Sequence, residues 1–335
     1  MMLTALSRCG VSTGAVTGSF TPPRILNDRI YRSTLGTDVY QGLGLAWATH
    51  QARGRYAPRA IMYSATPAVL YQPRAALRTP FAVRFDATIQ DSRPGRRFAV
   101  EHVLERRRLR AARVLLPTAL DVDPEIGRLL PRTVRTVPLP LPVKHLGGSE
   151  HREPTVVTYT GSPGKKGLDM IARAWHRTET GDRRLVVTGI TAEAGRRYLN
   201  QCGIDEPEGI EWPGLVSHAE FRALTASAEI YVSASTYEAY GMAQLEALSD
   251  GALLVTLPSP GQFVALPTAR RLAPGLVATD RSADALAHAL TNAIALPETV
   301  RRRYRREAAV LVQDHSEEVL DERLRTQVLP HLLEA

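Results

Sequence analysis

Strand-like and helix-like segments alternate through the second half of the chain. The strand-like segments are short, apolar and rich in β-branched residues, and a helix pattern follows most of them. The expected strands are Thr155–Thr160, Arg184–Gly189, Gly209–Trp212, Glu229–Ala234 and 252–257, and the expected helices are Leu168–Trp175, Thr191–Leu199, 241–250, 282–296 and 298–313. This alternation predicts βαβ units, and therefore a parallel sheet with helices on both faces.

The first half of the chain is harder to interpret. Ala60–Ser64, Phe81–Phe85 and Val114–Leu116 have strand patterns, and Gly95–Ala112 has the pattern of a long arginine-rich helix. A glycine-rich stretch near the start lacks the G-x-G-x-x-G spacing, so it does not indicate a dinucleotide site.

A proline-rich stretch beginning at Pro138 divides the two halves, because alternating prolines cannot continue a helix or a central strand. We therefore expect an N-terminal domain at 1–140, a linker at 141–153 and a C-terminal domain at 154–315. A last helix at 316–335 is expected to pack back toward the N-terminal domain.

The charge of the chain is distributed unevenly. Residues 1–150 carry 22 basic and 10 acidic residues, a net charge of +12, and the remainder carry 42 − 22 = 20 basic and 34 − 10 = 24 acidic residues, a net charge of −4. A basic first half indicates an anionic partner. The arginine-rich segment 93–113 fits a contact with anionic lipid or an acidic acceptor, or else a solvated face partly offset by Glu101 and Glu105.

The composition of the chain indicates the cellular compartment and the classes of partner to expect. The chain has two cysteines and no cysteine pattern of a disulfide framework or metal site, which favours a reducing compartment. The first residues lack the apolar core of a signal peptide, and no apolar run is long enough to span a bilayer. We expect a cytoplasmic protein, and a peripheral position on the inner membrane face is the alternative. The basic half lacks a nucleic-acid reading motif, so nucleic acid is not expected as a partner.

Two glutamates, Glu238 and Glu246, stand eight positions apart, the first in a polar loop after a strand and the second inside a helix. No Lys or Arg occurs from Ala223 to Ala269, so neither carboxylate has a cation nearby in sequence. A carboxylate that loses hydration needs donors, and a sugar diol supplies two. Gly241 opens the helix, whose N-terminus is suited to phosphate. The alternative is that Glu246 lies exposed on the helix surface.

A glycine- and lysine-containing loop follows the first strand of the second domain. It reads Tyr159-Thr-Gly-Ser-Pro-Gly-Lys-Lys-Gly167 and contains two of the three lysines of the chain, Lys165 and Lys166. Glycines let backbone amides approach a phosphate, and a lysine supplies the opposite charge. The loop does not match the P-loop pattern, and a polar turn with solvated lysines is the alternative.

Together these two sites resemble the donor domain of the family 4 retaining glycosyltransferases, which have the GT-B fold. The resemblance covers residues 154–296 and includes the E-x7-E block, the glycine-lysine loop, Gly251-Ala-Leu-Leu-Val255, and Ile210-Glu-Trp-Pro-Gly-Leu-Val216 beside the nucleotide base. It implies an α/β protein of two Rossmann-like domains facing each other across a cleft.

The resemblance also implies roles for individual residues. Lys166, with Lys165, would bind the donor diphosphate beside Gly161, and Glu246 would hold the ribose hydroxyls. Glu238, with the backbone of Tyr240, Gly241 and Met242, would contact the sugar or phosphate, and Val216 would border the base. Asp86, after a strand of the first domain, would lie near the donor sugar. Ser162 stands where the family has a phosphate-binding arginine.

The activity that the resemblance implies is metal-independent transfer of a sugar, with retention, from a UDP- or GDP-sugar to a glycan, lipid-linked or small-molecule acceptor. This is the chemistry of polysaccharide biosynthesis. No cofactor or metal is expected, because lysine and the helix N-terminus would offset the leaving-group charge. Ser162 and the short first half leave two alternatives open: a non-catalytic GT-B-like subunit that binds a glycan or stabilises a partner, and a sugar-nucleotide epimerase.

Overall fold

The computed structural model describes residues 2–17, 34–93, 95–119, 130–146 and 152–333. These residues form two compact units, one from 1–141 together with 317–335, and the other from 142–316. Each unit is a parallel sheet between layers of helices.

Unit 1 is built on a parallel sheet in the order β1-β2-β3-β4. Its strands are β1 (Ile61–Tyr63), β2 (Phe81–Phe85), β3 (Val114–Pro117) and β4 (Arg135–Thr136). The helical elements within its described residues are α1 (Met2–Arg8), α3 (Thr34–Tyr56), α4 (Thr66–Leu70), η1 (Ala76–Arg78), α5 (Ile89–Ser92), η2 (Arg96–Phe98), α6 (Ala99–Ala111), α16 (Glu317–Arg323), η5 (Leu324–Val328) and α17 (Leu329–Leu333).

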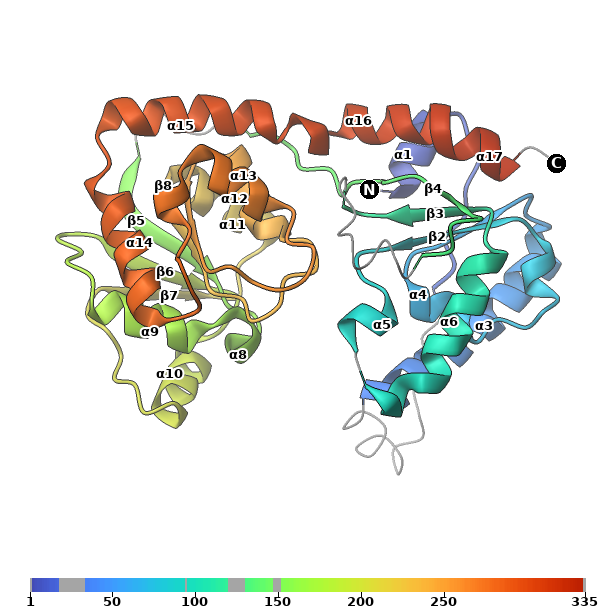
Figure 1. The fold of residues 1–335 in the computed structure, drawn as a ribbon, viewed down its shortest axis with the longest axis horizontal. Helices are drawn as coiled ribbons and strands as arrows, with labels where there is room; N and C mark the ends of the chain where they lie inside the picture. Colours follow the sequence, from blue (N-terminus) through green and yellow to red (C-terminus); the bar gives the residue numbers. More distant parts are fainter. Residues whose placement is uncertain (1, 18–33, 94, 120–129, 147–151, 334–335) are drawn as a thin grey trace. The chain divides into compact units, whose positions relative to one another are not determined.

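Alternate residues of the unit 1 strands fill two separate cores. Ala82 of β2 packs with Leu320 and the other apolar residues of the C-terminal helices, and Val83 packs with Leu109 of α6 and Val69 of α4. Neighbouring residues of a strand point to opposite faces of the sheet, so both faces are covered. Figure 1 shows α1, α16 and α17 on one face of this sheet and α4 and α6 on the other.

Unit 2 is built on a parallel sheet in the order β7-β6-β5-β8-β9. Its strands are β5 (Glu153–Tyr159), β6 (Arg184–Thr188), β7 (Ile210–Gly214), β8 (Ala228–Ser233) and β9 (Leu253–Thr256). Its helical elements are α8 (Pro163–Lys166), α9 (Leu168–His176), α10 (Ala192–Gln201), α11 (His218–Ser227), α12 (Met242–Ser249), α13 (Ala265–Leu272), η3 (Pro274–Leu276), α14 (Ala283–Ala295), α15 (Glu298–Leu311) and η4 (Gln313–His315).

The buried strands of unit 2 are continuous apolar runs, as expected when helices cover both faces of a parallel sheet. The helix α9 packs with α10 and α14, and α12 packs with α11 and α13, which gives the two helical layers (Figure 1). A capping box of Ser217 and Glu220 begins α11.

Two expectations about the first half are corrected. The segment 95–112 is not one helix, because the 3₁₀ turn Arg96–Phe98 precedes α6, which begins at Ala99. Glu101 and Glu105 are buried, so they do not lie among the exposed arginines as the solvated-face interpretation assumed.

Candidate functional site

The strand order of unit 2 reverses between β5 and β8. From β5 the chain proceeds through β6 to β7 on one side, and then crosses to β8 and β9 on the other side. In open parallel sheets, ligands bind beyond the carboxyl ends of the strands at such a switch point. The glycine-lysine loop follows β5 and the Glu238 loop follows β8, so the topology brings the two predicted sequence sites together.

Close backbone packing joins these two loops. Gly167 follows α8 with φ of 69°, and a Cβ atom there would overlap the carbonyl oxygen of Ala234 after β8. The backbone N–H of Thr236 donates to the carbonyl oxygen of Lys165 at 2.8 Å. Glycine is therefore required at 167 for both its conformation and its lack of a side chain.

Glu238 is buried and receives several hydrogen bonds on one oxygen. Its Oε2 accepts from Lys166 Nζ at 2.9 Å, Ser235 Oγ at 2.9 Å and Gln244 Nε2 at 3.1 Å. Gln244 Nε2 also donates to Ser233 Oγ at 2.8 Å, which ties the site to the end of β8. These bonds offset the cost of burying the carboxylate. The cation absent from the local sequence is supplied by the loop after β5.

The loop that follows β9 fixes the backbone of Glu238. The N–H of Glu238 donates to the carbonyl oxygen of Pro260 at 3.0 Å, and the carbonyl oxygen of Glu238 accepts from the N–H of Phe263 at 3.1 Å. Both the side chain and the main chain of Glu238 are therefore held in place. Nearby in β8, burial raises the pKa of Tyr231, and the charge of Glu238 raises it further.

The helix α12 begins directly beside this loop. Gly241 is its N-cap with φ of 90°, and Met242 is its first residue. The first N–H groups of a helix have no intrahelical partner and carry positive partial charge. Tyr240, which precedes Gly241, is buried, and its hydroxyl forms a hydrogen bond with His315 Nδ1 at 2.8 Å. This contact holds the residue before the helix in place.

Glu246 is buried rather than exposed, so the alternative interpretation of this residue is wrong. Its side chain is 6% exposed, and its Oε1 lies 2.7 Å from His218 Nε2 and 3.7 Å from Arg222 NH1. Arg222 also forms a bidentate pair with Asp250 and donates to the carbonyl oxygen of Lys144. Burial lowers the pKa of Arg222, but the carboxylates of Asp250 and Glu246 outweigh burial and raise it above the usual value.

The remaining predicted residues lie at the expected strand ends. Gly161 and Ser162 are exposed after β5, and the Tyr159 ring lies against Gly161, where a Cβ would overlap it. Val216 is half-buried before α11. Asp86 is exposed directly after β2 in unit 1. Lys165 is exposed, unlike Lys166, whose ammonium is paired.

Sequence reasoning missed the two partners of Glu246, His218 and Arg222. His218 is the first residue of α11, and the sequence does not indicate which way its imidazole points. Arg222 follows one turn later, and its partner Asp250 is distant in sequence. No motif links these residues, because the contact arises from the packing of α11 against α12.

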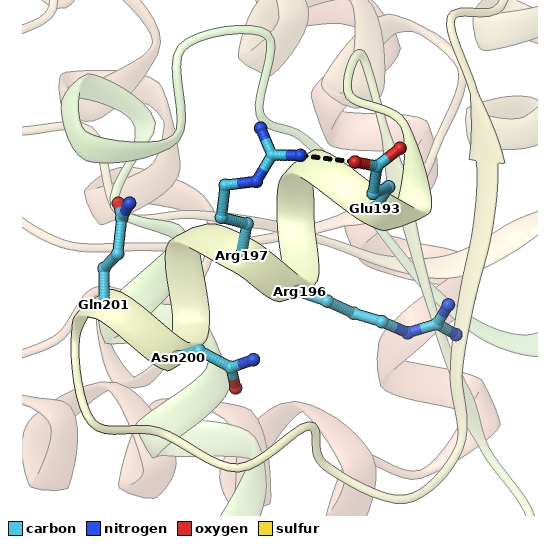
Figure 2. A pocket seen from close by; sticks show the side chains of 5 residues that line it. All are labelled: Glu193, Arg196, Arg197, Asn200 and Gln201. Carbon is cyan, nitrogen blue, oxygen red and sulfur yellow. Dashed lines mark hydrogen bonds and ion pairs between the residues drawn. The ribbon is translucent and has the colours of Figure 1, made fainter.

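A separate surface hollow lies along α10. It is lined by Glu193, Arg196, Arg197, Asn200 and Gln201. Figure 2 shows that these side chains come from one helix, and that Arg197 pairs with Glu193. None of them takes part in the network around Glu238 and Glu246, so this hollow is not assigned to the site.

In the described ranges, no three His, Cys, Asp or Glu side chains are grouped so that they could hold a metal ion. The helices of these ranges include none that is long and apolar enough to cross a membrane.

A family model matches the C-terminal part of the chain. Residues 154–295 match the family model of the glycosyl transferases group 1. The matched region contains the switch-point loops and both glutamates. The expectation of a glycosyltransferase-type enzyme is confirmed at this level. No curated protein matches the sequence.

Solved structures resemble the whole chain. Sucrose-phosphate synthase from Thermosynechococcus elongatus is 13% identical with a TM-score of 0.68, covering 94% of this chain and 83% of its own. Anabaena HepE in complex with UDP and glucose is 13% identical with a TM-score of 0.69, covering 96% and 87%. The UDP-forming α,α-trehalose-phosphate synthase from Burkholderia xenovorans, in complex with glucose-6-phosphate, is 13% identical with a TM-score of 0.64, covering 96% and 90%.

These likenesses extend over both units. They confirm the predicted α/β fold of the GT-B type, with two Rossmann-like domains.

Proposed function

We propose that this protein transfers a sugar, with retention, from a nucleotide-sugar donor held on unit 2 to an acceptor hydroxyl. The observation that carries the proposal is the pair formed by Lys166 and Glu238 at the switch point, with α12 starting at Met242 beside it. In the proposed complex, the diphosphate lies against Lys166 and the first N–H groups of α12. The ribose diol binds Glu246.

The proposed chemistry is departure of the nucleoside diphosphate, assisted by positive groups already in position. Lys166 and the N-terminus of α12 meet the negative charge that develops on the leaving oxygen. Glu238 orients the Lys166 ammonium through the 2.9 Å contact and, with Gln244, maintains the shape of the loop. Asp86 is proposed to lie near the donor sugar. No metal or cofactor is required in this scheme.

The finer assignments belong to the same proposal. Membership of family 4 and retention rest on the E-x7-E block and on Gly161 and Lys166 of the loop, while Ser162 departs from the family's arginine. The Anabaena protein is in complex with UDP and the Burkholderia synthase is UDP-forming, which makes uridine diphosphate sugars the first donors to test. The acceptor is proposed to be a glycan, a lipid-linked glycan or a small molecule in the cytoplasm, as in polysaccharide biosynthesis.

Two neighbouring lysines permit a matched test of the donor site. Calorimetry with UDP, GDP and their sugars measures binding to the parent protein, to K166Q and to K165Q. Lys166 is paired inside the site and Lys165 is exposed, so K166Q is expected to bind about 10- to 100-fold more weakly, and K165Q to change little. Thermal unfolding checks that K166Q is folded.

Product analysis then tests turnover and stereochemistry. With a donor and candidate acceptors, the anomeric configuration of the product by NMR distinguishes retention from inversion. Binding without transfer to any acceptor would favour the alternative of a non-catalytic subunit, and a changed free sugar nucleotide without acceptor would favour an epimerase. If no nucleotide diphosphate binds, the donor-site proposal is wrong.

A second candidate function, contact with anionic membrane, is favoured by one observation in unit 1. The residues Val100, Val103, Arg107 and Arg110 recur at helical spacing and are exposed on one side of α6, with Arg106 next to them. Glu101 and Glu105 lie on the buried side. We propose that this exposed stripe binds the inner membrane face peripherally, since basic and apolar residues together favour anionic lipid.

A further inference from the structure

The proposed ribose ligand, Glu246, has no strong anchor of its own on α12. Its side chain is only 6% exposed. A glutamate side chain has several rotamers, and burial alone does not fix one of them. A residue that must present a carboxylate oxygen to a diol in one direction needs a partner that fixes the other oxygen.

Arg222 is not that anchor. Its NH1 lies 3.7 Å from Glu246 Oε1, which is beyond hydrogen-bond distance. Its Nε and NH2 are committed elsewhere, to Asp250 at 2.7 Å and 2.6 Å and to the carbonyl oxygen of Lys144 at 2.6 Å. Arg222 therefore neutralises mainly Asp250, which is itself fully buried.

His218 forms the one short contact to Glu246 in the described structure. Its Nε2 lies 2.7 Å from Oε1, so the imidazole N–H donates to the carboxylate. The imidazole is otherwise 72% exposed, in contrast to the 6% of its partner. His218 is the first residue of α11, and the capping box of Ser217 and Glu220 stabilises this end of the helix. Within the described part of the chain, Oε2 of Glu246 has no hydrogen-bond partner.

We propose that His218 is a positioning residue for the nucleotide ribose. It fixes Glu246 through Oε1, and this leaves Oε2 directed toward the ribose hydroxyls. The exposed ring then lies beside the bound nucleotide, after the loop that contains Val216. This inference rests on the proposed function, because it assumes that Glu246 receives the ribose.

The test measures discrimination of the 2′-hydroxyl rather than affinity alone. Calorimetry compares a nucleoside diphosphate with its 2′-deoxy analogue on the full-length protein, using the base that the parent binds best. The parent is expected to prefer the ribose form by about tenfold, the value of one hydrogen bond to a charged group. H218A is expected to lose most of that preference, and H218Q, whose amide N–H can replace Nε2–H, to recover part of it.

Two control variants separate positioning from structure. E220A removes the capping box of α11 but keeps the imidazole, so it is expected to lower thermal stability and to retain the preference for ribose. H288A removes another exposed histidine of unit 2 and is expected to change neither.

The outcomes distinguish this inference from the proposed function. If the parent prefers the ribose form and H218A keeps the full preference, the role of His218 is refuted and the donor site stands. If E220A loses the preference as completely as H218A, His218 acts only through the structure of α11, and the inference is also refuted. If the parent binds no nucleoside diphosphate, the proposed function fails, and the inference with it.

Discussion

Glu105 is a buried carboxylate on the inner side of α6. It accepts the N–H groups of Ile89 at 2.8 Å and Gln90 at 3.3 Å, and so ties the start of α5 to α6. Burial raises the pKa of Glu105 above its usual value, although these hydrogen bonds act in the opposite direction. Between the unfolded pKa of 4.5 and the raised folded pKa, the folded protein therefore keeps a proton on Glu105 that the unfolded chain has released.

This shift predicts how stability depends on pH. The stability contributed by Glu105 is fully present below its unfolded pKa and falls as pH rises from the usual value of 4.5 toward the raised folded value. E105Q removes the titration. The free energy of unfolding of the parent relative to E105Q, from urea melts between about pH 4 and pH 7, is therefore expected to fall with rising pH. A difference that rises with pH would contradict the assignment.

Individual residues show where sequence reasoning stops. The loop spacing indicated Lys166 and the E-x7-E block indicated Glu238, but nothing in the sequence paired them, since they are 72 positions apart. The absence of basic residues around Glu246 suggested a carboxylate without a cation. Packing supplies His218 and Arg222 from a neighbouring helix.

At the scale of elements, the contact of the β5 loop with the β8 loop depends on Gly167. An alanine there would adopt a left-handed conformation at φ of 69° and overlap Ala234. We expect G167A to lower the free energy of unfolding by at least about 2 kcal/mol and to weaken nucleotide binding, since the loop can no longer seat on β8.

Gly164 provides the matched control, three residues earlier in the same loop. A Cβ there would lie 3.4 Å from the Tyr198 hydroxyl, an ordinary contact, and its φ is not positive. G164A in the helix α8 is expected to be neutral or slightly stabilising. Equal loss of stability in the two variants would show that the loop tolerates no change anywhere, and would remove the special role of Gly167.

The exposed stripe of α6 makes a second prediction at this scale. The triple variant R106Q/R107Q/R110Q is expected to lose most of its binding to phosphatidylglycerol vesicles in a sedimentation assay, with little binding to phosphatidylcholine by either protein.

The control for α6 is a charge-matched triple on α15. R302Q/R303Q/R306Q removes the same number of exposed charges, and Arg302 and Arg303 are already paired with Glu298 and Glu307. Vesicle binding should survive in this control. If the parent protein binds no anionic vesicles, or if both triples lose binding equally, the membrane surface on α6 is refuted.

Elements were predicted well where the pattern was regular. The unit 2 strands begin and end within about two residues of their predicted limits, because buried parallel strands are continuous apolar runs. The helix α13 was missed. Pro267 stands inside its pattern, yet it lies in the first turn, where a proline removes no intrahelical hydrogen bond. In unit 1, α3 contains Gly42, Gly44 and Gly54, which weaken a helix pattern.

At the scale of the whole molecule, the two units differ in how the chain builds them. Unit 2 is one continuous segment, 142–316, and it contains the contacts of Lys166 with Glu238 and of His218 with Glu246. Unit 1 is discontinuous, because the segment 317–335 completes it. The residues Leu320, Leu324, Val328 and Leu332 are buried in its core.

This division predicts the behaviour of two truncated proteins. The fragment 142–316 is expected to fold and to bind nucleoside diphosphates about as well as the full chain, as measured by circular dichroism and calorimetry. A chain ending at Ser316 is expected to be destabilised in unit 1, because four buried apolar side chains are removed, at about 1.5–3 kcal/mol each. A fragment that stays unfolded while the truncated chain melts normally would overturn the division.

Two kinds of sequence feature predicted the overall fold, the alternation of strands and helices and the motifs of the site. Alternation indicated a parallel α/β domain, and the two glutamates with the glycine-lysine loop indicated the GT-B type. The two cores of unit 1 could not be assigned in advance, since they depend on strands of only two to five residues and on a distant terminal segment.

The packing of the last helices against β2 and β3 also fixes an order of events during synthesis. Ala82, Val114 and Leu116 share their core with Leu6 of α1, but the part of this core that Leu320 and Leu332 supply is synthesised only at the end. Unit 2 is complete in sequence before that moment. Domains usually mature from the N-terminus onward. In this protein the unit that begins first in the sequence is completed last, because part of its core comes from the segment that follows unit 2.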